Sequence, residues 1–179
     1  VHPFMWTWIM YLLATVFAFA ALISGKNRYR KVTWELFVLG MIAHTYGMYL
    51  RAAITGRPPV SNMYETVVWV GWGAVFFSMF IEKFKPTNMA FIGSGLVGTL
   101  CLILSDMAPI VLDPSLSPLE PVLRDNFWLV VHVIIIVSSY AGFYLAFAVG
   151  DLLLAYYLLG EEKYKKQIKD GVNTIYRSE

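Results

Sequence analysis

Long uninterrupted runs of apolar residues limit this chain to a small number of folds. Each run approaches or exceeds the roughly 20 residues that a helix needs to cross the hydrocarbon core of a bilayer. Because lipid offers no hydrogen bonds to a bare backbone, only helices and closed barrels span it, and continuous apolar runs predict helices. We therefore expect an all-α, polytopic integral membrane bundle of about five transmembrane helices. The five runs cover residues 4–24, 34–52, 64–82, 88–109 and 127–159.

Composition agrees with a membrane protein. Charged residues make up 15% of the chain, against about 25% in soluble domains. We expect membrane lipid around the chain and no nucleic-acid partner. A single cysteine, Cys101, excludes an intrachain disulfide and a CxxC redox motif. The first run lacks a basic leader and a cleavage site, so it is not a signal peptide. Because the chain begins with Val1, we expect residues 1–179 to be one transmembrane domain of a longer protein.

The distribution of basic residues predicts the orientation in the membrane. Every lysine lies in the segment after the first run, the segment after the third run or the C-terminal tail. The positive-inside rule places these segments in the cytoplasm, with the N-terminus outside and the C-terminus inside. Arg51, Arg57 and Arg124 would then lie near the outer surface. Their side chains either snorkel to the interface or bind carboxylates, for which a guanidinium is well shaped.

One face of the last helix carries residues that suit haem. Arg124, Trp128 and His132 follow one another at intervals of four, so they lie roughly on one helical face. Haem offers carboxylates to a cation, a flat macrocycle to an aromatic ring and iron to an imidazole. Histidine inside a membrane segment is costly and therefore a functional candidate. The alternative is a histidine that forms a hydrogen bond between helices.

The second predicted helix carries a similar stripe. His44 follows Gly40 and precedes Gly47 on one face, which favours close packing around a hydrogen-bonded histidine. His2 is a further outer histidine, either a local second iron ligand or an exposed terminal residue. The sequence GSGLVG at 93–98 matches G-x-G-x-x-G but lies inside an apolar run, so we interpret it as helix packing rather than a dinucleotide site. Asn62, with Glu65 three residues later, indicates the start of a helix.

Two stretches carry a family resemblance. HTYGMYLRAAITGRPPVSNMYETVVWVGW at 44–72 and PVLRDNFWLVVHVIIIVSSYAGF at 121–143 together resemble the System II cytochrome c assembly proteins of the CcsA/ResC family. The match covers nearly the whole chain. The resemblance implies that His132 is one of two external histidines that bind the iron of haem b, which is both ligand and substrate. Trp128, Arg124 and Arg57 would contact the same haem, with His44 and His2 as additional candidates.

The resemblance also implies a reaction and partners. Haem held outside the membrane would be attached through thioether bonds to the CxxCH cysteines of apocytochrome c. A ResB/CcsB-like membrane partner or fused region and a thioredoxin-like reductant would take part, in a bacterial cytoplasmic membrane or a thylakoid membrane. In that family a second external histidine and a tryptophan-rich WWD segment lie further along the chain, and the resemblance implies that both would follow Glu179. This part of a cytochrome c haem lyase (synthase) should therefore be inactive by itself.

Two other classes of function remain open. A cytochrome b-like electron carrier would pair histidines from two helices around stacked haems and would turn over reversibly with quinol. A cofactor-free transporter or assembly subunit would show no Soret band after haem-replete expression.

The orientation can be tested by labelling cysteine variants in intact cells with a membrane-impermeant reagent. We expect labelling at Ser115→Cys, in an outer loop, and none at Lys165→Cys, in the cytoplasmic tail. The reverse pattern would contradict the predicted orientation.

Overall fold

The structure is a computed structural model that describes residues 3–56, 58–107 and 127–176. Within these ranges the chain forms helices and no strands, which confirms the predicted all-α class. The five helices are α1 (Pro3–Ser24), α2 (Asn27–Thr55), α3 (Met63–Phe84), α4 (Met89–Met107) and α6 (Phe127–Tyr176).

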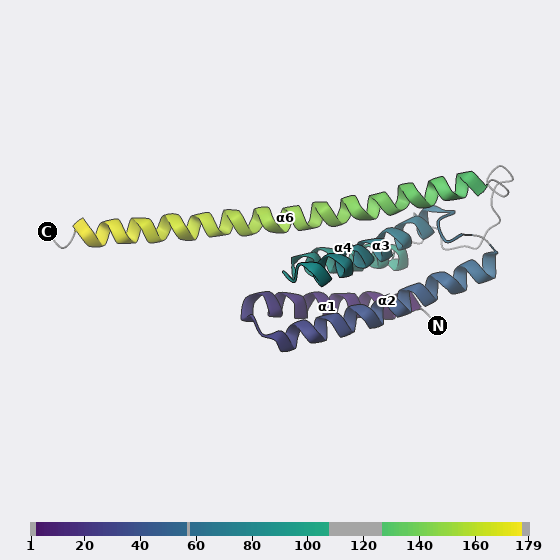
Figure 1. Ribbon diagram of the computed structural model, residues 1–179, viewed down its shortest axis with the longest axis horizontal. Coiled ribbons are helices and arrows are strands. Elements are labelled where there is room, and N and C mark those ends of the chain that lie inside the picture. Colours follow the sequence, from purple (N-terminus) through teal and green to yellow (C-terminus); the bar gives the residue numbers. More distant parts are fainter. Residues whose placement is uncertain (1–2, 57, 108–126, 177–179) are drawn as a thin grey trace.

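The helices pack in a bundle with α3 and α4 in its middle. Helices α1 and α2 lie side by side on one flank, and α6 lies on the opposite flank (Figure 1). Helix α1 packs against both α2 and α4, whereas α6 packs against α3 and α4. Because α2 and α6 lie on different flanks, side chains of α3 can contact both.

Four of the described helices are long and apolar enough to cross a membrane, so this is a multi-pass membrane protein. These segments are Phe4–Ser24, Met63–Phe84, Met89–Met107 and Val130–Leu158. Helix α2, with 29 residues, is long enough but less apolar. It carries His44 and Thr33, whose side chains are buried against its neighbours. Composition therefore does not identify α2 as the predicted fifth span. Its packing along α1 is what supports that prediction.

Helix α6 is longer than the sequence predicts. The apolar run ends near residue 159, but the helix continues to Tyr176 and extends well past the other helices (Figure 1). Its 50 residues correspond to about 75 Å at 1.5 Å per residue. The polar tail continues the helix because residues such as Glu, Lys and Gln are good helix formers that do not need burial.

The connection between α2 and α3 begins at a glycine. Gly56 has φ of 66°, and its N–H donates to the carbonyl of Ala52 at 2.9 Å, which caps the end of α2. Pro58 and Pro59 follow. Because proline cannot continue a helix, the chain turns and starts α3 at Met63.

Glycines of α4 bring the central helices close together. A Cβ added to Gly98 would lie 3.1 Å from the ring of Tyr11 and 3.2 Å from Val75. A Cβ at Gly95 would overlap the hydroxyl of Thr15. Both glycines belong to the 93–98 motif, so its interpretation as helix packing is confirmed. Tyr11 itself is fully buried in this core.

Gly95→Ala should therefore destabilise the bundle, because the added methyl forces α1 and α4 apart. Overpacking of this kind costs about 1–3 kcal/mol. Gly142→Ala is the matched control, because no described atom outside its own helix lies within 4 Å of the new Cβ. Thermal unfolding in detergent should show a lower midpoint for Gly95→Ala only. Equal midpoints for both variants would show that the close contact is not required.

Candidate functional site

His132 is exposed on the surface of α6, in the first turn of its membrane-spanning segment. Apolar side chains surround it on the same surface, including Ile135, which is 63% exposed. An imidazole facing lipid would lose its hydrogen bonds to water, at a cost of several kcal/mol unless another group replaces them. The structure therefore presents His132 to something other than the described helices.

Contacts between α3 and α6 fix the depth of His132. The indole N–H of Trp69 donates to the Ser138 hydroxyl at 3.1 Å, and a Cβ at Gly73 would meet Ala141. These pairs show that α3 and α6 run in the same direction. Each residue of α3 lies beside the residue of α6 whose number is nearly seventy higher. His132 therefore lies level with Tyr64, in the first turn of α3.

A polar cluster occupies the same end of the bundle. The guanidinium of Arg51, on α2, lies 3.5 Å from the Glu65 carboxylate and 4.5 Å above the Tyr64 ring. Glu65 is only 2% exposed and the Arg51 side chain only 15%. This pair joins the end of α2 to the start of α3 beside the loop that contains Arg57.

Glu65 also organises the start of α3. Its own N–H donates to the Asn62 side chain at 2.7 Å, which confirms the predicted helix start. Its carboxylate accepts hydrogen bonds from the backbone N–H and the hydroxyl of Ser61, at 2.9 and 2.6 Å. Charged hydrogen bonds of this kind are the stronger ones in proteins. A single carboxylate thus holds the loop, the helix start and the end of α2.

His44 lies in different surroundings from His132. It is fully buried, with Nδ1 3.2 Å from the Tyr11 hydroxyl and its ring edge-to-face with Phe4. A haem could reach it only if α1 and α2 separated. The geometry favours the packing interpretation of this histidine.

Four of the predicted haem contacts lie outside what the structure describes. Arg57, Arg124 and His2 fall outside the described residues, as does the predicted outer loop at 110–126. Trp128 lies within α6, but its side chain is not described. The structure thus places His132 and His44 and shows that they do not face each other.

The sequence matches a known family over most of its length. The family described as "Cytochrome C assembly protein" matches residues 60–177, which include all of α3, α4 and α6. The chain belongs to this family.

Individual relatives agree with the family match. The cytochrome c biogenesis protein CcsA of Synechococcus sp. (strain RCC307) is 33% identical over 146 residues, which are 80% of this chain and 45% of that protein. The CcsA of Synechococcus sp. (strain CC9311) is 30% identical over 161 residues. Protein NrfI of Wolinella succinogenes is 32% identical over 126 residues, or 13% of its length. The chain therefore spans about half the length of the CcsA relatives it matches.

The sequence indicated parts of the polar cluster around Glu65 but not how they combine. The Asn62–Glu65 spacing predicted a helix start, and Arg51 stood out as an outer arginine. That these two helix ends pair through Glu65 depends on how α2 and α3 meet. No spacing within either helix reveals it.

The ion pair can be measured with a double-mutant cycle. Arg51→Met or Glu65→Met alone leaves a buried charge without its partner, which costs about 3–5 kcal/mol in buried pairs. The double variant should lose clearly less than the sum, with a coupling of about 1–3 kcal/mol. The free energy of unfolding in detergent gives these values, with the exposed Lys85→Met as control. Simple additivity would show that the pair does not hold α2 to α3.

Proposed function

We propose that this chain is part of a membrane machine for cytochrome c biogenesis that holds haem at the outer face of the membrane. Haem is the substrate, delivered for thioether attachment to the CxxCH cysteines of apocytochrome c. The observation that carries the proposal is His132, an exposed imidazole at one end of an apolar helix, in a chain of the cytochrome c assembly family.

His132 is the proposed ligand of the haem iron. Neutral imidazole offers one ring nitrogen to iron while the other keeps a proton for a hydrogen bond. Binding to iron would compensate for the hydrogen bonds to water that this imidazole loses on an apolar surface. The second axial ligand would come from another part of the protein, since the CcsA relatives are about twice as long as this chain.

The remaining predicted residues would hold the rest of the haem. Arg57 and Arg124 would bind the propionates through charged hydrogen bonds, and Trp128 would pack on the macrocycle. The Arg51–Glu65 pair supports this arrangement, because it joins the ends of the two helices between which Arg57 falls in the sequence. His2 stays a further outer candidate, whereas His44 is assigned to packing.

The attachment chemistry requires thiols and an accessible vinyl group. Each thiol adds across one vinyl double bond: sulfur bonds to one carbon, hydrogen to the other, and no electrons are gained or lost overall. The cysteines must therefore arrive reduced, which a thioredoxin-like reductant would ensure. A ResB/CcsB-like partner or fused region would complete the haem site, in a bacterial cytoplasmic membrane or a thylakoid membrane.

Chemical rescue of His132→Gly in the full-length protein tests this proposal. We expect loss of low-spin haem and of cytochrome c maturation, with both restored by added imidazole, because free imidazole can occupy the vacated ligand position. Ile135→Gly is the matched control: it places the same helix-weakening glycine one turn away on the exposed surface. Full haem content and maturation in His132→Gly without imidazole would refute the assignment.

A further inference from the structure

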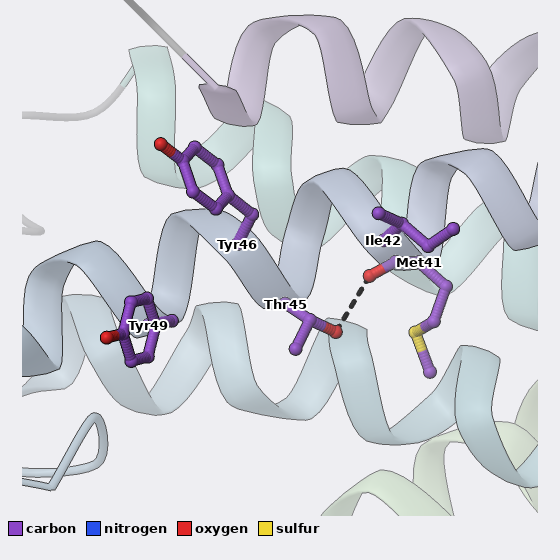
Figure 2. Close-up of a pocket in the computed structure, with 5 residues that line it drawn as sticks. All are labelled: Met41, Ile42, Thr45, Tyr46 and Tyr49. Carbon is purple, nitrogen blue, oxygen red and sulfur yellow. Dashed lines mark hydrogen bonds between the residues drawn. The ribbon is translucent and has the colours of Figure 1, made fainter.

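The surface of α2 differs in chemistry between its middle and its start. In the middle, an open groove of about 440 Å³ is lined by Met41, Ile42, Thr45, Tyr46 and Tyr49. All five side chains come from this one helix (Figure 2), and the Thr45 hydroxyl donates to the Met41 carbonyl at 2.8 Å. The groove therefore presents apolar and aromatic surface without charge. The start of α2 is basic instead, and it lies beside a second basic segment.

Cations gather where the α1–α2 and α3–α4 connections meet, and we call this surface the basic end. Its members are Lys26, Arg28, Arg30 and Lys31 around the start of α2, and Lys83 and Lys85 around the end of α3. A guanidinium N–H of Arg30 donates to the Glu82 carbonyl at 3.5 Å, and the ring centroids of Trp34 and Phe91 lie 5.0 Å apart. These contacts hold the two connections side by side, so their cations form one surface.

The acidic side chains nearby do not pair with these cations. Glu82 is fully buried, and its carboxylate turns toward α4, where it accepts hydrogen bonds from the Ala90 N–H and the Thr87 hydroxyl, both at 3.2 Å. Glu35 of α2 and Asp151 of α6 are exposed. Among the described residues, no ion pair joins these acids to the cations of the basic end. Positive charge therefore remains available to a ligand from outside the bundle.

Arg30 is the cation that packing holds most firmly. Its side chain is half-buried between α2 and α3, whereas the five other cations are exposed. The long hydrogen bond to the Glu82 carbonyl uses one of the five N–H donors of the guanidinium. Phosphate suits the remaining donors, because two of its oxygens can each accept a hydrogen bond from the planar fork.

Exposed apolar side chains adjoin the basic end. Phe80 and Phe84 of α3 are 62% and 67% exposed, and their ring centroids lie 5.0 Å apart, on the turn that also carries Lys83. Ile23, at the end of α1, is exposed as well. A ligand that matches both surfaces is an anion that carries hydrocarbon chains. Basic surfaces at the cytoplasmic ends of membrane helices recognise anionic lipid headgroups in this way.

We propose that the basic end binds one anionic phospholipid. Arg30 holds the phosphate, the surrounding lysines attract the headgroup, and the chains lie along Phe80 and Phe84. The predicted orientation places this lipid in the cytoplasmic leaflet. Its site is separate from the proposed haem ligand, because His132 lies level with the start of α3 and the basic end lies at the end of α3. The bound lipid links the α1–α2 connection to the α3–α4 connection.

Native mass spectrometry of the full-length protein in detergent, titrated with single lipids, tests this site. We expect a lower Kd for phosphatidylglycerol than for phosphatidylcholine with the same chains. Arg30→Gln should raise the Kd for phosphatidylglycerol about 5-fold, the factor that one cation near an anionic headgroup contributes. Lys83→Gln should act in the same direction, and because Lys83 is exposed its loss leaves the packing intact. Arg30→Lys, which keeps the charge, should retain most of the preference.

Two control variants lie outside the basic end. Lys165→Gln removes one charge from the part of α6 that extends past the other helices (Figure 1), and Tyr49→Leu removes an exposed ring from the α2 groove (Figure 2). Both should leave the Kd for phosphatidylglycerol unchanged. Glycerol 3-phosphate in excess carries the anion without the chains and should not displace the lipid.

Three results would overturn the lipid site. The first is an equal Kd for the two lipids with the unaltered protein. The second is an equal Kd for phosphatidylglycerol in Arg30→Gln, Lys83→Gln and Lys165→Gln. The third is displacement of the lipid by glycerol 3-phosphate, which would identify a site for free phosphate compounds instead.

Discussion

The lack of water in the bilayer core governs how this chain uses its polar side chains. A polar group inside the membrane must find its hydrogen-bond partner within the protein. Among the described residues, Tyr11 faces His44, and Trp72 donates to Thr45. Each of these contacts joins two different helices. Such pairs connect neighbouring helices, while glycines such as Gly95 and Gly98 let the helices approach closely.

His132 is the exception that links this packing to function. It lies on an apolar surface at the depth of the Arg51–Glu65 pair, and it faces away from the described helices. Trp69 and Trp72 find hydrogen-bond partners on neighbouring helices, whereas the His132 imidazole is exposed on an apolar surface and is available to a ligand that the described residues do not supply. The same end of the bundle also holds the Glu65 carboxylate, which organises the start of α3. A rigid helix end, a fixed loop and an available imidazole together suit the capture of an amphiphilic, iron-containing ring.

The sequence predicted the helices well and the contacts between them poorly. Apolar runs of membrane length identified the described helices, and the 93–98 glycines were correctly interpreted as packing, because both signals are local. The continuation of α6 to Tyr176 was missed, since hydropathy reports burial in lipid rather than helix formation. The partner of Glu65 was missed as well, because it depends on the meeting of two helix ends. For His44, the stripe of neighbouring glycines favoured packing, and its contact with Tyr11 agrees.

A ligand exchange at position 132 tests the central claim most directly. In the full-length protein loaded with haem, His132→Cys would offer the iron a thiolate in place of an imidazole. We expect the Soret band and the low-spin electron paramagnetic resonance signals to change to those of thiolate ligation. Ile135→Cys, one turn away on the same exposed surface, should leave both unchanged. Imidazole-type spectra in His132→Cys, with full haem content, would show that the iron is held elsewhere and would contradict the role assigned to His132.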